Sequence, residues 1–419
     1  MRLNSERIYH DPLHGAIALD ATDPVEALLI QLIDTPAFQR LRRIRQLGPA
    51  SLTFHGAESS RFTHSLGVMA IARRAFDRLC KWSPGLRPYR AVVLTAALLH
   101  DIGHGPFSHT AEEIFGSHHE LWTARILQES APIRERLQAH HPDLLPQILQ
   151  VYAHSHPVPL VWQLVSSQLD CDRLDYLMRD SYFTGTSYGR IDLERILTAL
   201  ETDPHTQQLV VAHKGLSAVE HYLIVRCFMY AQVYNHPKNI AATWTLEQAF
   251  NRARELVQAG QLQPDATVQA WLLENCDRLP LADYLAADDG VFLYHLQRWQ
   301  HHPDPILADL SRRYCDRDLC KCLDISHLTS DHRQALLRAT HTHLTAAGFH
   351  APYYSGIRIF FSRGYRLYQK GIQIRTAHGL VDINTLSPLV QTLIQSHERA
   401  WLIYPREVES GVRSQLPPA

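Results

Sequence analysis

The segment LLHDIGHGPFSH, residues 98–109, is the most informative part of the chain because it closes an apolar run with a histidine–aspartate pair. The run before it, AVVLTAALL, is typical of a buried helix, and the glycines and proline of GHGP disfavour its continuation. Adjacent helical residues point about 100° apart, so His100 and Asp101 can converge on one ion. His104 and His109 would then lie near the helix end, where a substrate can reach them.

The composition indicates a soluble globular protein. The chain has 419 residues, 45% of them hydrophobic and 20% charged, enough for one large domain or two to three ordinary ones. Its 41 basic and 42 acidic side chains nearly cancel, so we expect neither nucleic acid nor a membrane as a partner. The start is polar, without an export signal, and the apolar run above is far shorter than the roughly 20 residues of a membrane span.

The seven cysteines are spread thinly, which suits a reducing compartment better than a disulfide framework. We therefore expect a cytoplasmic protein. The local segment CDRDLCKC, residues 315–322, resembles half of a zinc site but lacks a second Cys or His pair at the usual spacing. Ordinary structural cysteines are the favoured interpretation there.

Hydrophobic periodicity predicts helices through most of the first 260 residues. Apolar residues recur every third position from Phe38 to Leu47, the stripe of a half-buried helix. The arginines between them would form a solvated or ligand-facing side rather than a nucleic-acid surface. Further helices are predicted over 64–79, 89–104, 160–181 and 216–236.

The C-terminal part changes in character near residue 345. The segment SGIRIFFSRGYRLYQKGIQIRT, residues 355–376, has β-branched and aromatic residues with spaced glycines, and predicts two or three strands in hairpins. A helix over 386–401 and a strand over 400–408 would complete a small α/β subdomain. Its basic edge could hold a phosphate, or be an ordinary positive face or subunit contact. The basic residues are Arg358, Arg363, Arg366, Lys370 and Arg375.

A histidine–aspartate pair cannot complete a metal site alone, since a divalent ion takes about four to six ligands. His64, which opens an apolar helix in SSRFTHSLGV, is a further candidate. The segment SSQLDCDRLDYLMRD supplies crowded carboxylates, which need cations or a metal as partners. Each residue taken singly could be structural, as a capping histidine or a salt-bridged aspartate. The carboxylates are Asp170, Asp172, Asp175 and Asp180.

The order His64, His100–Asp101, Asp172 resembles the signature of the HD superfamily of metal-dependent phosphohydrolases. Longer motifs resemble its deoxynucleoside triphosphate triphosphohydrolase branch, which includes the animal enzyme that joins a SAM domain to its HD domain. These motifs are DPLHG, DTPAFQRLRRIRQLG, SRFTHSLGV, LLHDIGHGPFSH, DRLDYLMRDSYFTG and MYAQVYNHPK. They span residues 8 to about 240 with no SAM-like segment before them, as in the compact bacterial form.

The resemblance implies a mainly α fold with an HD-domain helical core and a smaller C-terminal α/β subdomain. We expect the HD phosphohydrolase core over 1–260, a helical extension over 261–344 and the α/β subdomain over 345–419. Members of the resembled family assemble through their helical core. The resemblance therefore implies a homo-oligomer, either a dimer or a tetramer.

The metal ligands implied by the resemblance are His64, His100, Asp101 and Asp172. Two neutral imidazoles and two carboxylates would nearly neutralise a divalent ion and leave positions for water and a phosphate oxygen. The family uses manganese, iron or magnesium, and ligation by nitrogen and oxygen does not decide between them.

The resemblance places His104, His109 and His119 around the substrate phosphates, where imidazoles suit developing negative charge. Glu112 follows His109 by three residues, so a contact on the same helix face would hold the ring and favour a protonated general acid. The neighbouring His118 is expected at the surface. Which histidine protonates the departing 5′ oxygen stays open.

Several further residues match substrate contacts of the family, where arginines would bind phosphates. Asp180 would accept a hydrogen bond from the 3′-hydroxyl, and Tyr176 would exclude a ribose at C2′, although the matched tyrosines could instead be core aromatics. Asn235 stands where glutamine is expected, so base or sugar selectivity could differ. Asp34 and Arg42 match a site for an activating nucleotide between subunits. The substrate set is Gln46, Leu47, Arg61, Arg173, Tyr176, Asp180, Arg226 and Tyr234.

The matches together imply hydrolysis of deoxynucleoside triphosphates to deoxynucleoside and triphosphate, by water attack at the α-phosphorus. One alternative is another HD-family phosphatase or phosphodiesterase, acting on a monophosphate, an alarmone or a cyclic nucleotide. The sequence lacks the GYP-type motif of cyclic-dinucleotide enzymes and the acidic residues that alarmone hydrolases carry after the HD helix. A second alternative is a non-catalytic nucleotide or nucleic-acid binding protein.

Overall fold

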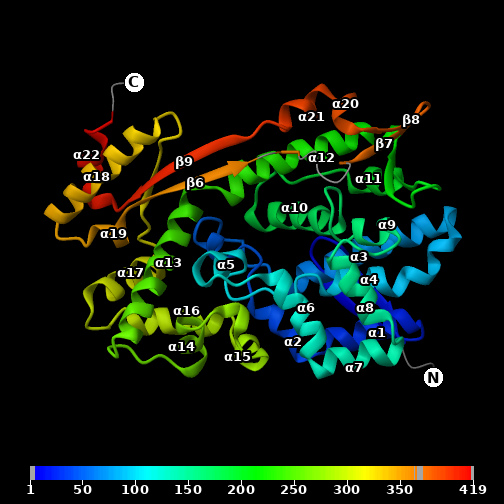
Figure 1. Ribbon diagram of the computed structural model, residues 1–419, viewed down its shortest axis with the longest axis horizontal. Helices are drawn as coiled ribbons and strands as arrows, with labels where there is room; N and C mark the ends of the chain where they lie inside the picture. Colours follow the sequence, from blue (N-terminus) through cyan, green and yellow to red (C-terminus); the bar gives the residue numbers. More distant parts are fainter. Residues whose placement is uncertain (1–4, 363, 366–370, 417–419) are drawn as a thin grey trace.

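The computed structural model describes residues 5–362, 364–365 and 371–416. The described chain is mainly helical, which confirms the predicted fold class (Figure 1). The half that carries the HD segment contains α1 Pro24–Ile33, α2 Pro36–Arg40, α3 Arg61–Trp82, α4 Arg90–Leu99, α5 His109–Phe115, α6 His119–Glu129, α7 Ala131–His140, α8 Leu144–Tyr152, α9 Pro159–Gln163, α10 Cys171–Thr184, α11 Leu193–Ala199 and α12 Leu216–Met229.

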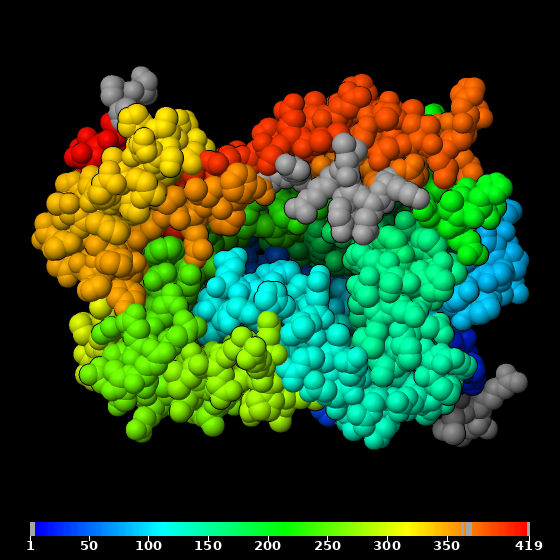
Figure 2. Space-filling view, viewed as in Figure 1, coloured from blue at the N-terminus to red at the C-terminus, as the bar shows by residue number. Residues whose placement is uncertain are grey.

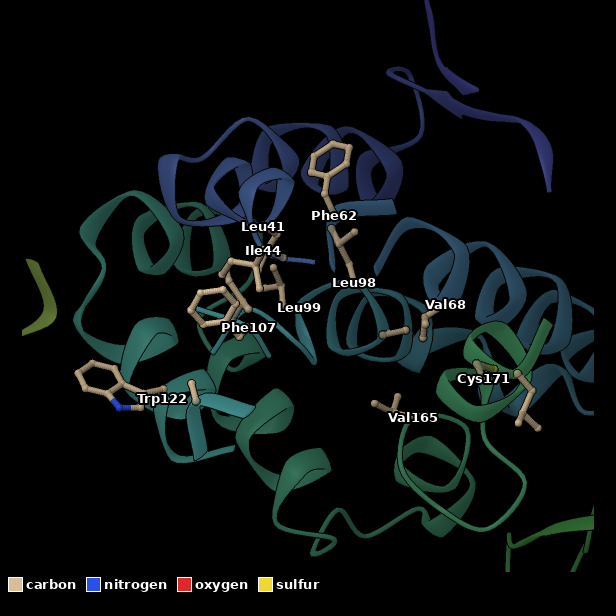
Figure 3. Close-up of a cluster of buried hydrophobic side chains, with 14 of the residues drawn as sticks. Leu41, Ile44, Phe62, Val68, Leu98, Leu99, Phe107, Trp122, Val165 and Cys171 are labelled. Atoms are coloured by element: carbon tan, nitrogen blue, oxygen red, sulfur yellow. The ribbon is translucent and has the colours of Figure 1, made fainter. Parts of the chain in front are cut away.

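The HD pair lies at the rim of a close-packed core. Helix α3 packs against α4 and α10. Helix α4 ends at Leu99 with His100 as its C-cap, so Asp101 lies in the following turn, earlier than the helix end expected at GHGP. Figure 3 shows Leu99 beside Leu41, Ile44 and Phe107, and all four side chains are buried. Because such interiors are packed like crystals, the polar residues that follow Leu99 have little freedom to move.

The remaining helices form the other half of the molecule, on the left and along the top of Figure 1. They are α13 Pro237–Gln258, α14 Ala266–Leu273, α15 Leu281–Ala286, α16 Asp289–Trp299, α17 Pro305–Cys315, α18 Ser330–Ala346, α19 Ala351–Tyr354, α20 Ile383–Leu386, α21 Pro388–Leu393 and α22 Glu409–Arg413. One hydrophobic cluster runs through both halves, from Ile17 to Val412. Among the described helices, none combines the length and apolar character needed to cross a bilayer.

Three small sheets accompany the helices. The hairpin β1 Glu6–Asp11 and β2 Gly15–Asp20 stands alone, with Glu6 opposite Asp20. A four-stranded sheet has the order β3 Leu200–Thr202, β4 Leu209–Ala212, β7 Gln373–Thr376, β8 Gly379–Asp382, and a three-stranded sheet the order β5 Lys321–Asp324, β9 His397–Tyr404, β6 Gly356–Ser362. The C-terminal strands thus pair with earlier ones, for example in the parallel register of Val211 with Ile374. The domain boundaries themselves stay a prediction.

The structure corrects several local expectations. The helix predicted over 386–401 is limited to α21, and β9 already begins at His397, before the predicted strand over 400–408. The stripe from Phe38 to Leu47 is not one helix. Helix α2 ends at Arg40 and a 3-10 turn covers Leu41–Arg43. The chain is then extended, and Gln46 N donates to the carbonyl of Ser59, just before α3. The region 160–181 breaks between α9 and α10, because Asp170 caps a new helix. In segment 355–376, β6 and β7 belong to different sheets instead of one hairpin. The predicted helix over 64–79 is confirmed by α3, and the one predicted over 89–104 is confirmed by α4 as far as Leu99, whereas residues 100–104 lie in a turn.

Candidate metal centre and active site

Four of the predicted ligands converge at the junction of α3, α4 and α10. His64 Nε2 lies 3.0 Å from Asp172 Oδ1 and 3.5 Å from Asp101 Oδ2. His100 Nε2 lies 3.4 Å from Asp101 Oδ1 and 3.6 Å from Asp172 Oδ1. We call this group, formed by His64, His100, Asp101 and Asp172, the HD cluster.

The HD cluster fits a divalent cation. His64 Nδ1 donates to Asp175 Oδ2 at 2.8 Å and His100 Nδ1 donates to the Ala97 carbonyl at 2.9 Å, so both Nε2 atoms face the carboxylates. His100 Nε2 is buried and has no hydrogen-bonding partner among the described residues. Burial opposes a charge on His64, yet its hydrogen bonds to the carboxylates of Asp172 and Asp175 raise its pKa to about 10. The site therefore attracts positive charge, and its oxygen and nitrogen donors suit Mg²⁺, Mn²⁺ or Fe²⁺.

A buried ion network supports the HD cluster from behind. Asp175 accepts hydrogen bonds from His64, from His14 Nε2 at 2.5 Å, and from Arg179 Nε and Nη2 at 2.7 and 3.0 Å. Arg179 also donates to Asp11 Oδ2 at 2.8 Å. Burial raises the pKa of Asp175, but Arg179 and the two histidines lower it to well below its usual range. Asp175 is thus a carboxylate that fixes the tautomer and orientation of His64.

The close approach of α10 to α3 explains the glycine of HSLGV. A Cβ at Gly67 would lie 2.0 Å from Asp175 Oδ1 and 2.5 Å from Arg179 Nη2. The sequence analysis did not identify the roles of His14 and Arg179. The available signal was the four-residue spacing of Asp175 and Arg179 on one helix face, whereas His14 is remote in sequence.

Arg61 is buried beside the HD cluster. Its Nη1 donates to Asp101 Oδ2 at 2.5 Å and its Nε donates to Ser108 Oγ at 2.9 Å. Burial raises the pKa of Asp101, but Arg61 and the nearby histidines hold it well below its usual range. Arg61 also reaches the carbonyl of Gln46, whose Oε1 is buried without a partner among the described residues. The predicted phosphate contact of Arg61 stays a prediction.

Three histidines and a glutamate form a second group, the histidine cluster of His104, His109, Glu112 and His119. Glu112 pairs with His119 Nδ1 through one oxygen and with His109 Nδ1, at 3.3 Å, through the other. The His104 ring stacks on His119 with centroids 4.1 Å apart. Burial raises the pKa of Glu112, but hydrogen bonds from His109 and His119 hold it well below the usual range. Burial, with Arg61 and His119, lowers the pKa of His104, which keeps that imidazole neutral.

The turn between His104 and His109, within the histidine cluster, is held by the distant helix α16. Phe107 and Ser108 have φ angles of 61° and 58°, in the left-handed region that non-glycine residues seldom adopt. Asp289, on α16, accepts from Phe107 N at 2.7 Å through Oδ1 and from Arg45 N at 3.0 Å through Oδ2. Burial raises the pKa of Asp289 to about 6.

The predicted sugar contacts gather along α10 and the π-helical turn Tyr230–Tyr234 after α12. Tyr234 Oη donates to Asp180 Oδ2 at 2.9 Å, and the Tyr176 and Tyr234 rings lie 6.0 Å apart. Burial raises the pKa of Asp180 to about 7. Arg226 lies over the Tyr230 ring. Leu47 is partly buried against the core.

The other predicted residues have structural partners. Arg173 pairs with Asp170, the cap of α10. Asp34 pairs with Arg7, and Arg42 lies over the Phe62 ring at 3.6 Å. The surface prediction for His118 is confirmed, since it is exposed and pairs with Asp277.

The C-terminal basic residues and the cysteines also have ordinary surroundings. Arg358 pairs with Glu247 and Arg375 with Glu201, whereas Arg363, Arg366 and Lys370 lie outside the described residues. The cysteines of residues 315–322 are free thiols.

Figure 2 shows a hollow in the middle of one face, at the place where α5, α10 and α13 lie in Figure 1.

Three comparisons bear on this geometry. The family described as HD domain matches residues 61–175, and the HD associated region matches residues 191–347. The protein YwfO of Bacillus subtilis is 40% identical over 326 residues, 78% of this chain and 73% of YwfO. A deoxynucleoside triphosphate triphosphohydrolase SAMHD1 homolog of Dictyostelium discoideum is 28% identical over 61% of this chain and 51% of its own length. A phosphohydrolase of Bacteroides thetaiotaomicron has a TM-score of 0.84 at 30% identity, over 96% of this chain and 100% of its own.

Proposed function

The chain belongs to the HD superfamily of phosphohydrolases and is related to its deoxynucleotide triphosphohydrolases. From this premise we propose that it hydrolyses deoxynucleoside triphosphates to deoxynucleoside and triphosphate. One observation carries the proposal. His104 Nε2 lies 3.3 Å from Asp101 Oδ1, which joins the histidine cluster to the HD cluster. On α10, Asp172, Tyr176 and Asp180 follow at four-residue steps, so a sugar contact would continue the same helix face.

The HD cluster would hold one divalent ion, manganese, iron or magnesium, through His64, His100, Asp101 and Asp172. When bound, such an ion polarises a phosphate oxygen and lowers the pKa of a coordinated water. Arg61 would keep Asp101 ionised and aligned, and Asp175 would keep the His64 Nε2 lone pair directed at the ion.

The histidine cluster would manage the charge and the proton of the leaving group. The attacking water gives up a proton and forms a bond to the α-phosphorus, the bond from that phosphorus to the 5′ oxygen breaks, and the 5′ oxygen takes a proton. Because Glu112 occupies Nδ1 of both His109 and His119, each ring has Nε2 available for a phosphate or the leaving oxygen. The neutral His104 would support these rings by stacking on His119.

The sugar would lie along α10, with Tyr176 against C2′ and Asp180 accepting from the 3′-hydroxyl. Gln46 and Leu47 would border the sugar edge. Arg173, Arg226 and Tyr234 would complete the contacts to phosphates and sugar. A ribose would meet the Tyr176 ring with its 2′-hydroxyl, which accounts for a preference for deoxynucleotides.

Assembly and regulation are part of the same proposal. The relationship to SAMHD1 homologues supports a homo-oligomer, either a dimer or a tetramer. The cytoplasmic location stays a prediction from the thinly spread cysteines. An activating nucleotide would bind near Asp34 and Arg42 after the Arg7–Asp34 ion pair opens.

Product identification tests the proposal. The purified protein is incubated with Mn²⁺ and each deoxynucleoside triphosphate, singly and mixed, with ribonucleotides as controls. Deoxynucleoside plus intact triphosphate is the expected result, and activity only in mixtures would support the activator site. Monophosphate, diphosphate or no turnover would refute it, and would favour an HD-family phosphatase or phosphodiesterase acting on another nucleotide.

The variant Asp101→Ala separates an enzyme from a binding module. Loss of a metal carboxylate should abolish hydrolysis, whereas nucleotide binding by the C-terminal strands would survive if the protein were non-catalytic. Hydrolysis that persists in Asp101→Ala would contradict the role of the HD cluster.

A further inference from the structure

The histidine cluster has the composition of a metal site in its own right. One ligand atom from each of His104, His109, Glu112 and His119 can be chosen so that all four lie within 4.8 Å of one another. The residues come from three places in the fold: the turn after α4, the first turn of α5 and the start of α6. The turn and the two helix starts thus bring together donors that lie between residues 104 and 119.

The distances inside the cluster are close to those around a small ion. Ligands at about 2.0–2.1 Å from a tetrahedral ion lie roughly 3.4 Å from one another. His109 Nδ1 is 3.3 Å from Glu112 Oε2, His104 Nδ1 is 4.0 Å from Glu112 Oε1, and His119 Nδ1 is in direct contact with that oxygen. Small side-chain rotations, mainly of the exposed His109, would bring all four ligand atoms to bonding distance from one ion.

His104 supplies an independent sign that a ligand belongs there. Its side chain is 1% exposed, and neither ring nitrogen makes a hydrogen bond among the described residues. Nε2 has Asp101 Oδ1 at 3.3 Å, whereas Nδ1 faces Glu112 Oε1 at 4.0 Å and is the atom that an ion would reach. A buried polar atom without a partner costs free energy. An ion held by His104, Glu112 and His119 would satisfy one of these nitrogens directly.

We propose that His104, His109, Glu112 and His119 form a second cation site, separate from the HD cluster, that takes a borderline ion such as Zn²⁺. Three imidazoles and one carboxylate suit Zn²⁺, whereas Mg²⁺ prefers oxygen ligands. Binding displaces the protons that Glu112 shares with His109 and His119, since metal ligands must be deprotonated. Zinc should therefore inhibit hydrolysis, a consequence that rests on the proposed function.

Counting bound zinc tests the site without reference to activity. Metal-free protein is titrated with Zn²⁺ against a chromophoric chelator, and the bound zinc per chain is measured after gel filtration. The wild type should bind two ions, one in each cluster. His119→Ala, Glu112→Gln and His64→Ala should each lose one ion, and a His64→Ala/His119→Ala double variant should lose both. His118→Ala is the matched control, because His118 is adjacent but pairs outside the cluster with Asp277, and it should keep two.

Either of two results would overturn the site: a single ion in the wild type that His119→Ala keeps and His64→Ala loses, or two ions retained by both His119→Ala and Glu112→Gln. Circular dichroism should confirm that these variants fold. A separate assay adds Zn²⁺ to the Mn²⁺-loaded protein. If the second ion binds and no deoxynucleotide is hydrolysed under any condition, the proposed function fails and the zinc site stands. If hydrolysis occurs and the only zinc that binds is retained by His119→Ala, the zinc site fails and the proposed function stands.

Discussion

His64 donates its Nδ1 proton to Asp175 Oδ2 across 2.8 Å inside the core, and both side chains have 0% exposure. When an ion replaces the proton on Nε2, this hydrogen bond would leave the Nε2 lone pair on the side of Asp172 and Asp101. An outer carboxylate of this kind typically contributes tenfold or more to metal affinity. The function of the HD cluster therefore depends on a residue that does not itself reach the ion.

Replacing Asp175 by Asn should weaken divalent metal binding by about 10- to 100-fold, since the amide cannot hold His64, His14 and Arg179 as an anion does. Arg179 would also lose its buried counter-charge, so the thermal midpoint should fall. Mn²⁺ titration and thermal unfolding measure the two effects. Asp143→Asn, which alters an exposed carboxylate, is the control. Unchanged metal affinity in Asp175→Asn would contradict the positioning role.

Gly67→Ala should destabilise the fold by about 1–3 kcal/mol, the usual cost of overpacking. The new Cβ would meet Asp175 and Arg179 and force the ion network apart. Chemical denaturation measures the change in the free energy of unfolding. Gly85→Ala is a matched control, because nothing lies within 4 Å of a Cβ there. Equal effects of the two substitutions would show that the close approach is not limiting.

Asp180 should make stability depend on pH. Burial raises its folded pKa to about 7, above an unfolded value of about 3.9. The folded state then binds more protons than the unfolded state between these values, so stability falls as the pH rises from about 4 to 7. At about 1.4 kcal/mol per pKa unit the contribution is at most about 4 kcal/mol.

Asp180→Asn removes this ionisation, so the variant should gain stability relative to the wild type as the pH rises from about 5 to 8. Thermal unfolding of both proteins across this range measures the difference. A difference that stays constant with pH would mean that Asp180 ionises normally.

Removal of the divalent ion by a chelator should lower the thermal midpoint. A ligand that binds only the folded state, at a free concentration a hundredfold above its Kd, stabilises by about 2.7 kcal/mol. Without the ion, the carboxylates of the HD cluster face only Arg61 and protonated imidazoles. His64→Ala should respond less to the chelator than the wild type does, and an equal response would place the stabilising ion elsewhere.

The sequence predicted the helices that carry the HD cluster because their apolar positions follow helical periodicity. The grouping of His64, His100, Asp101 and Asp172 in space also agrees with the expectation, although their role as ligands stays a prediction. Periodicity reports which side chains are buried but not what they contact, so the pairing of Arg61 with Asp101 was not predicted.

The other differences between the predicted and the observed structure also arise because periodicity does not report which residues contact one another. The contact of His14 with Asp175 joins residues 161 positions apart, and no local pattern encodes it. The apolar repeat continues from Phe38 to Leu47, but the backbone is helical only as far as Arg43. Beyond it, hydrogen bonds such as that from Gln46 N to the Ser59 carbonyl replace the helical ones. Strands β6 and β7 likewise found partners in other parts of the chain.

Asp289 lies on α16, inside the HD associated region, yet it holds the backbone of Phe107 within the HD domain. The two matched regions are therefore not independent modules joined end to end. A fragment limited to residues 61–175 would retain every ligand of that segment while losing the support of the turn that orients His104 and His109. In evolution, the HD segment of this chain could not be exchanged for another without a compatible α16, so the two regions are expected to be inherited together.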